Sequence, residues 1–409
     1  MRILRINDYM GTPGGTESYI EAVSARLTAL GHPQRLLTIS DVEEHLAYRR
    51  MPGEEVFPLR ALGVRRVLED LVDLPPLRER LAQIVSEFRP DLIHLHHFDS
   101  LFTPLARFLR DVAVPIVITA HDAKLVCPIA TLVLPDGRLC EGGILPRCQF
   151  TGCAVGFGLP YKLEQVRIFR DMVMPRISLY LAPSQAARAF LERHGMRPTR
   201  VLAPIVEIPA AVLEQPPRPI SSGPVVGFLG RIEAYKGVMT LVEAWPKVRA
   251  ALPGARLVFA GRGPLEAALR QRAADLHLEG AVQFRGWVDG PAKEAFFEEI
   301  QLLAVPSEGY ENFGLIGLEA MARGRGVLGS RLGGIPDWLI DGEVGRLLAP
   351  GDREVWAQAL VEALRSPEQV ARWGAQARRR YLDHYPPQVH VVGLLDAYQS
   401  VLSAPGPNR

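Results

Sequence analysis

The chain has 409 residues, which is too long for one ordinary hydrophobic core and suits two domains of about 200 residues each. Hydrophobic residues make up 48% and charged residues 22%, a composition typical of soluble globular proteins. The net charge of +2 gives no broad positive field, so the sequence excludes nucleic acid as an expected partner.

The N-terminal sequence MRILRIND leads directly into a strand-like run, without the charged and apolar regions of a secretory signal. We find no stretch of about 18 apolar residues and therefore expect a cytoplasmic protein without a membrane-spanning helix. Peripheral contact with the inner face of the membrane stays open, because residues 59–68 combine three arginines with apolar side chains. A solvated helix face would have the same composition.

Short apolar runs alternate with helix-length amphipathic segments along the whole chain. Runs this short and this apolar are typical of strands buried on both faces, as in parallel sheets covered by helices. The alternation occurs twice and predicts two Rossmann-like, doubly wound α/β domains. The predicted strands are residues 2–6, 35–39, 91–96, 115–121 and 179–184 in the first half, and 225–231, 256–261, 282–287, 302–307 and 326–330 in the second.

The boundary between the halves is predicted at a linker rich in Pro, Ser and Gly, residues 207–223. It separates an N-terminal domain, residues 1–206, from a C-terminal domain, residues 224–385. Two prolines precede a last helix, residues 386–409, whose apolar side is expected to pack back on the N-terminal domain. Two α/β domains that face each other place the carboxyl ends of both sheets at a shared cleft, where we expect the ligand.

Candidate site residues of the N-terminal domain lie at the start of its first helix and at the ends of two predicted strands. Backbone N–H groups at a helix start are suited to a phosphate. A lone histidine at a strand end more often has a structural role, so the residues alone leave a structural and a functional role open. The candidates are Gly14 and Gly15 at the helix start, His96 and His97 after one strand, and His121 and Asp122 after the next.

All four cysteines fall within residues 127–153, which we interpret as a Cys-rich insertion in the N-terminal domain. A cytoplasmic location disfavours disulfides, so the leading hypothesis is one structural zinc ion held by four thiolates. Disulfides, a redox pair or plain thiols stay open, because the spacing lacks the Cys-x2-Cys knuckles of typical zinc ribbons. The proposed ligands are Cys127, Cys140, Cys148 and Cys153.

Two cations follow the first predicted strand of the C-terminal domain, in the sequence GFLGRIEAYKG. Arg231 comes directly after the strand, and Lys236 is one of only five lysines in the chain. Cations beside flexible glycines at a strand end are suited to an anionic ligand such as a diphosphate. A turn with two surface cations is the alternative.

The sequence PSEGYENFGLIGLEAMARG, residues 306–324, combines a strand end, a Gly-rich loop and a helix that starts near Leu315. The unpaired N–H groups of a helix start can bind phosphate oxygens. Glu319 lies one turn into the helix, where its carboxylate can accept from two ribose hydroxyls, and Glu311 is placed for a second sugar. The backbone donors expected to reach the phosphates are Asn312, Phe313, Gly314 and Leu315. Ordinary acids near a helix start are the alternative.

These motifs resemble those of the retaining glycosyltransferases of family 4, which have the GT-B fold. The sequence ENFGLIGLE resembles the family's Glu-x7-Glu motif, and the Arg231–Lys236 segment resembles its diphosphate clamp. The stretch AGRGP, with Gly261 and Gly263, resembles its Gly-x-Gly turn. GGIPD (333–337) and GTPGGTE (11–17) resemble two further family motifs, in the family's order along most of the chain.

The resemblance implies that the N-terminal domain binds the acceptor and the C-terminal domain binds a nucleotide sugar. Family members use the second glutamate to hold the donor's ribose, and they carry a histidine that contacts the donor sugar or its reacting centre. Transfer with retention of configuration and a UDP-sugar donor are implied. Implied catalytic residues are His121, Arg231, Lys236 and Glu311; Glu17, His96, His97 and Asp122 are expected on the acceptor side. The acceptor can be a glycan, a lipid-linked sugar or a small molecule.

No Asp-x-Asp triplet of the kind that holds a divalent ion occurs in the sequence. We therefore expect no catalytic metal, with Arg231, Lys236 and the helix start taking the role of the ion. Two alternatives are a nucleotide-sugar epimerase of the same architecture, which needs no acceptor, and a nucleotide-sugar-binding module that has lost catalysis.

Overall fold

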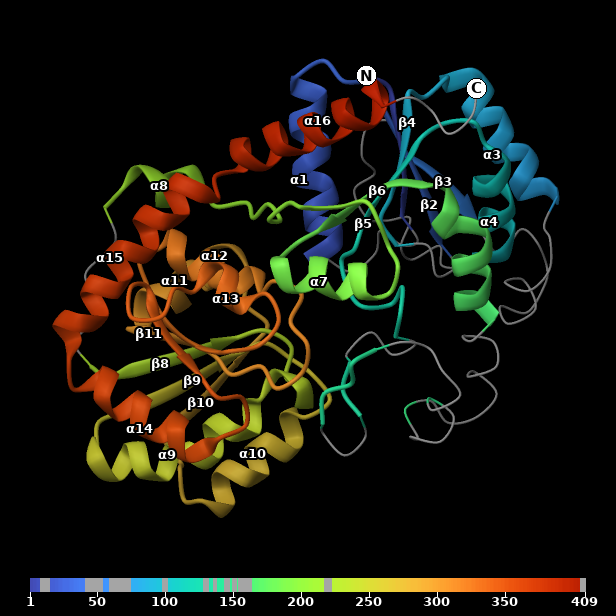
Figure 1. Cartoon of the computed structure of the whole chain (residues 1–409). Coiled ribbons are helices and arrows are strands. Elements are labelled where there is room, and N and C mark those ends of the chain that lie inside the picture. The colour runs from blue at the N-terminus through green and yellow to red at the C-terminus, as the bar shows by residue number, and fades with distance from the viewer. Residues whose placement is uncertain are drawn as a thin grey trace. The chain divides into compact units, whose positions relative to one another are not determined.

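The structure of the protein is a computed structural model, shown in Figure 1. It describes residues 1–7, 15–40, 54–58, 75–97, 102–127, 132–134, 138–142, 148, 153, 164–216 and 223–404. Gly14, the basic and apolar segment 59–68 and much of the Cys-rich segment lie outside the described residues. Among the helices that are described, none combines the length and the apolar character needed to cross a bilayer.

The chain divides into two compact units. The first comprises Met1–Pro135, Cys140–Ile205 and Pro387–Arg409, and the second comprises Asp136–Leu139 and Val206–Pro386. The last segment of the chain therefore belongs to the first unit. Each unit contains one parallel sheet with helices packed against it, which confirms the predicted α/β fold with two doubly wound domains.

The first unit has a parallel sheet whose described strands run in the order β3-β2-β1-β4-β5-β6-β7. β1 lies inside the sheet, between β2 and β4, and all five of its residues are buried because the sheet is covered on both faces. Its neighbours are in register through Ile3, which pairs with Gln34 on one side and Leu92 on the other. The strands are β1 (Ile3–Asn7), β2 (Gln34–Ser40), β3 (Glu54–Pro58), β4 (Leu92–Leu95), β5 (Ile116–Thr119), β6 (Ile177–Ala182) and β7 (Thr199–Val201).

Helices of the first unit connect and cover these strands, and α16 at the chain end packs against α1. The apolar side of α16 enters the core of this unit, where Val391, Leu394 and Tyr398 are buried. The helices are α1 (Gly15–Ala29), α3 (Pro75–Phe88), α4 (Phe102–Asp111), α7 (Gln185–Arg193) and α16 (Pro387–Ser403). A π-helical turn, Phe169–Val173, and a 3₁₀ turn, Met174–Arg176, precede β6.

The second unit has a parallel sheet in the order β10-β9-β8-β11-β12-β13. The strand order reverses between β8 and β11, and ligands of such sheets bind at the carboxyl ends of the strands at this switch point. The strands are β8 (Val225–Leu229), β9 (Arg256–Ala260), β10 (Val282–Gly286), β11 (Leu302–Val305), β12 (Gly326–Ser330) and β13 (Gly345–Leu348).

Helices lie on both faces of this second sheet, with α9 and α14 together on one face and α11 and α12 on the other (Figure 1). Trp245 of α9 and Trp356 of α14 are fully buried in the core beneath them. The helices are α8 (Ala210–Glu214), α9 (Val238–Ala251), α10 (Glu266–Asp275), α11 (Gly290–Glu299), α12 (Leu315–Ala322), α13 (Ile335–Trp338), α14 (Arg353–Leu364) and α15 (Pro367–His384). A 3₁₀ turn, Ala234–Lys236, precedes α9.

Candidate active site

The predicted donor-binding segments follow β8 and β11, the two strands that flank the switch point of the second sheet. Gly237 has φ +67°, and a Cβ at this position would lie 1.9 Å from the carbonyl oxygen of Pro306. The N–H groups of Glu308 and Gly309 both donate to the carbonyl of Tyr235 at 2.8 Å. The turn after β8 is thus joined to the loop after β11, which brings the two predicted motifs together.

Lys236 and Glu311 form an ion pair where these two loops meet. The Lys236 Nζ lies 2.7 Å from the Glu311 Oε2, which also accepts a hydrogen bond from the Ser307 hydroxyl at 3.0 Å. The side chains of Lys236 and Glu311 are only 22% and 15% exposed. Burial lowers the pKa of Lys236 and the Glu311 carboxylate raises it, and the net pKa lies above the usual value. Lys236 therefore remains a fixed positive charge at physiological pH.

Arg231 differs from Lys236 in its surroundings. Its side chain is 69% exposed and forms an ion pair with Glu233. A long exposed cation of this kind is free to change its rotamer when an anion binds, whereas Lys236 is held in place.

The glycines of the AGRGP stretch pack the loop after β9 against the turn that carries Arg231. Gly261 has φ +139°, and a Cβ there would lie 1.8 Å from the carbonyl oxygen of Gly230. A Cβ at Gly263 would lie 2.3 Å from the carbonyl oxygen of Ile232. Only glycine permits these close approaches, so the two residues shape the loop that was predicted to receive the donor.

Helix α12 starts at the glycine of the ENFG sequence and is held by a buried tryptophan. Gly314, at φ +90°, is the N-cap residue, and Leu315 is the first residue of the helix. The indole N–H of Trp338 donates to the carbonyl of Phe313 at 2.6 Å. A Cβ at Gly317 would lie 2.3 Å from the Trp338 ring, so this glycine lets the ring lie against the helix. These contacts fix the direction in which the first N–H groups of α12 point.

The GGIPD turn holds the backbone of Glu311. The Gly334 N–H donates to the Glu311 carbonyl at 2.7 Å. Gly333, at φ +56°, approaches so closely that a Cβ would lie 2.1 Å from the same carbonyl oxygen. The resemblance to the family motif at residues 333–337 thus has a physical basis, because this turn positions the carboxylate-bearing loop.

We expect Gly333→Ala to lower the free energy of unfolding by about 1–3 kcal/mol and to weaken nucleotide binding, because the new methyl group displaces the Glu311 loop. Gly342→Ala is the matched control, since Gly342 has φ +82° with open space around its Cβ position. Denaturant unfolding and nucleotide titration of both variants check this. Equal effects of the two substitutions on both measurements would show that the contact with Glu311 has no role.

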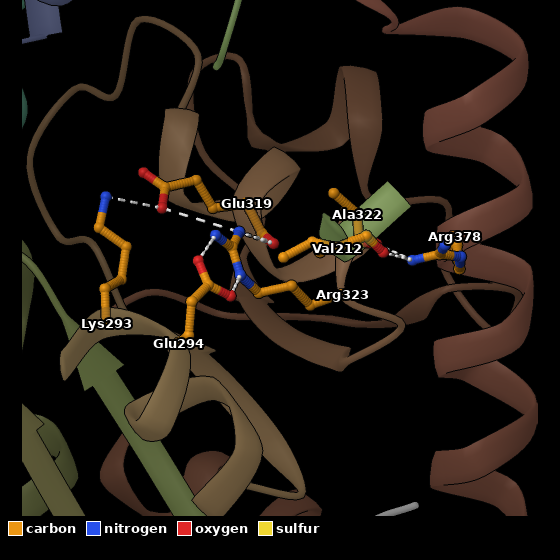
Figure 2. A network of polar contacts seen from close by, with 7 residues as sticks. All are labelled: Val212, Lys293, Glu294, Glu319, Ala322, Arg323 and Arg378. Atoms are coloured by element: carbon orange, nitrogen blue, oxygen red, sulfur yellow. Dashed lines mark hydrogen bonds and ion pairs between the residues drawn. The ribbon is translucent and has the colours of Figure 1, made fainter. Parts of the chain in front are cut away.

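Glu319 belongs to a charged network between α11 and α12, shown in Figure 2. Its Oε2 lies 3.0 Å from the Lys293 Nζ and 3.9 Å from the Arg323 Nη1. Arg323 is 6% exposed and binds Glu294 through two nitrogens at 2.8 and 2.5 Å. The guanidinium also donates to the Glu319 carbonyl at 2.8 Å. Glu319 is therefore held from both helices, at one side by a lysine and at the other by a buried arginine.

The sequence interpretation did not include Lys293, Glu294 or Arg323. The rarity of lysine in the chain was the only sequence signal for Lys293. At the other end of α12, Arg378 of α15 donates to the carbonyls of Ala322 at 2.5 Å and Val212 at 3.1 Å (Figure 2). It satisfies carbonyl groups at the ends of α12 and α8, which are unpaired within those helices.

In the first unit, β4 and β5 bring the predicted histidines together. The His96 Nδ1 lies 2.9 Å from the His121 Nε2, and the His97 Nε2 lies 3.4 Å from the Asp122 carboxylate. His94, which precedes His96 and His97 in the sequence HLHH, is fully buried and contacts the Tyr398 hydroxyl of α16 at 2.6 Å. A pocket in this unit is lined by His96, His97, His121, Asp122, Lys124 and Gln165 among others.

Two other predicted residues lie on α1. Gly15 is its first residue and Glu17 lies in its first turn. Glu17 is half-buried and is not among the described residues that line the histidine pocket. Its role on the acceptor side stays a prediction.

Burial keeps the histidines of this cluster neutral. It lowers the pKa values of His94, His96 and His121 well below the usual range, and the positive charge of Arg5 lowers all three further. Burial also lowers the pKa of His390 to about 4, although its hydrogen bond to the Ala203 carbonyl acts in the opposite direction. At neutral pH these imidazoles are hydrogen-bonding groups without charge.

Stability should therefore fall as the pH drops through the histidine range. The pKa of His390 is about 4 in the folded protein and 6.5 as its ordinary value. Between pH 6.5 and pH 4, His390 therefore takes up a proton mainly in the unfolded chain, which favours unfolding. His390 alone should lower the free energy of unfolding by about 3 kcal/mol between pH 7 and pH 4. His390→Gln should make thermal melts less pH-dependent, and replacement of the exposed His384 is the control. An unchanged slope in His390→Gln would contradict this.

The predicted zinc site finds no support. None of the four cysteines is in a disulfide. Within the described residues, which include all four, no three histidine, cysteine or acidic side chains come together in the way a metal site requires. The Cys140 sulfur instead accepts a hydrogen bond from the Gly142 N–H at 3.4 Å. Proximity in sequence suggested a cluster, but the backbone does not bring the four thiols to one point.

Comparison with known proteins agrees with this architecture. The model of the "Glycosyl transferases group 1" family matches residues 223–366, and that of the "Glycosyl transferase 4-like domain" matches residues 14–204. The phosphatidyl-myo-inositol mannosyltransferase of Mycolicibacterium smegmatis is 34% identical over 99% of this chain and 95% of its own. The Mycobacterium leprae protein of that name is 39% identical over 93% of both chains.

Solved structures show the same fold. HepE of Anabaena, in complex with UDP, has a TM-score of 0.71 at 19% identity and covers 98% of this chain and 100% of its own. Sucrose-phosphate synthase of Thermosynechococcus elongatus has a TM-score of 0.74 at 20% identity and covers 99% and 100%. The two units thus have the GT-B fold. From the family models and the full-length relatives together, this chain belongs to family 4, the group 1 glycosyltransferases.

Proposed function

We propose that the protein transfers a hexose from a nucleoside-diphosphate sugar to a hydroxyl group of an acceptor, with retention of the anomeric configuration. The observation that carries the proposal is the half-buried Lys236–Glu311 pair, 2.7 Å apart, at the switch point of the second sheet. A protonated lysine held there can neutralise the charge that develops on a leaving diphosphate. The carboxylate beside it can accept hydrogen bonds from hydroxyls of the donor sugar.

The remaining donor contacts follow from the same geometry. The first N–H groups of α12 and the mobile guanidinium of Arg231 would bind the two phosphates. Glu319, one turn into α12, would accept from the ribose hydroxyls, which then replace Lys293 as partners of its carboxylate. Charge stabilisation by these groups needs no divalent ion, consistent with a sequence that lacks an Asp-x-Asp triplet.

The histidine pocket of the first unit would form the acceptor side of the reaction. His121 would contact the donor sugar, and His97 with Asp122 would lie on the acceptor side. Among the described residues that line this pocket, Asp122 is the one carboxylate that could act as a nucleophile, and it pairs with His97. We therefore favour a front-side route, in which the leaving phosphate assists the attack of the acceptor.

For the donor nucleotide we propose UDP, which is bound in the solved structures of Anabaena HepE and of a variant of S. aureus TarM. For the donor sugar, the relatives named phosphatidyl-myo-inositol mannosyltransferase make mannose the first hexose to test. The same names, and relatives named D-inositol 3-phosphate glycosyltransferase, support an acceptor that contains inositol, either as a lipid headgroup or as a free phosphate ester. A lipid acceptor would bring the protein to the surface of a membrane.

Mass spectrometry of reaction products tests the proposal. The purified protein is incubated with UDP- and GDP-linked glucose and mannose, each with inositol, inositol phosphate or phosphatidylinositol vesicles. A glycosylated acceptor together with released nucleoside diphosphate supports the transferase. Conversion of the donor sugar without an acceptor, detected by chromatography because epimers have equal mass, would indicate the epimerase, and donor binding without turnover would indicate the binding module. Either result would overturn the proposed reaction.

A further inference from the structure

Arg5, in the interior strand β1, is a buried arginine beside the histidine cluster. Its side chain is fully buried. The hydrogen-bond partners of its guanidinium in the described part of the chain are neutral: the Ile20 carbonyl, the Ser24 hydroxyl, the Gln34 amide oxygen and the His96 ring. A charge without a carboxylate partner is costly to bury, so its presence at this position calls for a role.

The contact between Arg5 and His96 determines which ring nitrogen of His96 carries the proton. The Arg5 Nε and Nη2 lie 3.2 and 3.1 Å from the His96 Nε2. A guanidinium can only donate hydrogen bonds and does not lose its proton in proteins, so the His96 Nε2 must be the acceptor. The proton of a neutral His96 is therefore on Nδ1.

The tautomer of His96 in turn determines that of His121. The His96 Nδ1 lies 2.9 Å from the His121 Nε2. Because the His96 nitrogen is the donor, the His121 Nε2 must accept, and the proton of His121 is then on its Nδ1. A doubly protonated His121 would have no lone pair with which to accept this bond. The Nδ1 of His121 makes no hydrogen bond to a residue that the structure describes, and His121 lines the pocket.

We propose that Arg5 is a positioning residue that fixes the tautomers of His96 and His121, so that His121 presents a neutral Nδ1–H donor to the pocket. His121 then binds an oxygen atom of the ligand and cannot take a proton from it, because its remaining lone pair is used by His96. The catalytic part of this inference rests on the proposed function, whereas the tautomers do not depend on it.

Tyr19 and His390 also hold the rings of His96 and His121 in place. The Tyr19 ring packs edge-on against His121 and His96, with ring centres 5.1 and 5.9 Å apart. The Tyr19 hydroxyl bonds the His390 Nε2 at 3.1 Å, and the His390 Nδ1 bonds the Ala203 carbonyl at 2.7 Å. Since a carbonyl only accepts, His390 also has its proton on Nδ1, and Tyr19 is the donor to its Nε2. The orientation of Tyr19 is thereby fixed.

Nitrogen-15 NMR of the full-length protein with labelled histidine tests the tautomers directly, because protonated and unprotonated ring nitrogens have different shifts. His96→Asn and His121→Asn variants assign the two signals. We expect both residues of the wild type to be protonated on Nδ1 and unprotonated on Nε2. Protonation of either residue on Nε2 in the wild type would overturn the proposal, and this outcome requires no Arg5 variant to fold.

Variants at Arg5 then test whether Arg5 determines the tautomers of His96 and His121. Arg5→Met removes the donor to His96 and should give a mixture of tautomers at His96 and His121, whereas Arg5→Lys keeps a cationic donor and should restore the single form. Arg188→Met, at an exposed arginine of α7 paired with Glu192, is the control and should leave the tautomers unchanged. Wild-type tautomers in Arg5→Met would refute the role of Arg5.

The consequence for the proposed transfer is measured separately. Arg5→Met should lower kcat roughly 10- to 100-fold with a smaller change in the donor KM, because a misplaced donor group at the reacting centre mainly affects the transition state. Arg5→Lys should recover part of the rate. A normal kcat in an Arg5→Met variant with mixed tautomers would overturn the catalytic part. Absence of any transfer by the wild type would instead count against the proposed function and leave the NMR result standing.

Discussion

Replacing Lys236 with alanine is expected to lower kcat by about 100- to 1,000-fold, because a fixed positive charge beside a leaving phosphate acts mainly in the transition state. Donor affinity should change much less, since we propose that Arg231 and the start of α12 also bind the diphosphate in the ground state. Steady-state kinetics give kcat, and equilibrium titration with the donor gives the Kd. The substitution also leaves the Glu311 carboxylate half-buried without its cation, so thermal melts must accompany the kinetics.

Lys247→Ala is the matched control for this experiment. Lys247 lies on α9, is 62% exposed and pairs with Glu354 at the surface. An exposed ion pair contributes little to stability, so this variant should have wild-type kinetics. If Lys236→Ala lost donor affinity and kcat/KM equally while kcat stayed unchanged, Lys236 would be a binding residue only, and its assigned role would be wrong.

Replacing Glu319 with alanine is expected to weaken donor binding by about 100-fold or more. The proposed contact supplies two hydrogen bonds from the ribose to the carboxylate, each worth about 1.5–3 kcal/mol, and the substitution removes both. The Kd for the free nucleoside diphosphate should rise as much as that for the nucleotide sugar, because the ribose is common to both. Isothermal titration with each ligand checks this.

The control for Glu319→Ala must account for the charged network around it, because the substitution leaves Lys293 without its carboxylate. Lys293→Ala removes the same ion pair while it keeps Glu319. If the ion pair matters only for structure, the two variants should behave alike. We expect Lys293→Ala to bind nucleotide far better than Glu319→Ala does, and equal losses would contradict contact between Glu319 and the ribose.

Most strands could be predicted because central strands of a covered parallel sheet are buried on both faces and therefore almost entirely apolar. The run at residues 326–330 coincides with β12, for example. The strands that were missed, β3, β7 and β13, all lie at the edges of their sheets. An edge strand is less covered, so it carries charged residues, as in the sequences EEVFP, TRV and GRLL, and has no apolar signature.

The site residues that could be predicted lie within short motifs, where spacing alone sets geometry. Gly314, Leu315 and Glu319 belong to one loop–helix segment, and the chain needs no distant contact to order them. The cysteines show the limit of this reasoning, because residues close in sequence need not bring their side chains to one point.

The residues that could not be predicted act through contacts between distant segments. Lys293 reaches Glu319 from a different helix, and Arg5 reaches His96 from a neighbouring strand, 91 residues away in the sequence. Such pairs follow from the order of strands in the sheet, which the apolar pattern does not contain. The contact of His94 with Tyr398 could not be predicted for a similar reason, since Tyr398 comes from the last helix of the chain.

The most direct test of donor binding by the second unit is a thermal-shift panel of UDP, GDP, ADP and their hexose conjugates with the wild-type protein. A ligand at about 100 times its Kd stabilises the folded state by roughly 2.7 kcal/mol, which corresponds to a rise of a few degrees in Tm. We expect one nucleoside diphosphate and its sugar conjugates to raise the Tm, and the Glu319→Ala variant to show no rise at the same concentrations. No shift with any nucleotide, or an undiminished shift in Glu319→Ala, would contradict the assignment of this site.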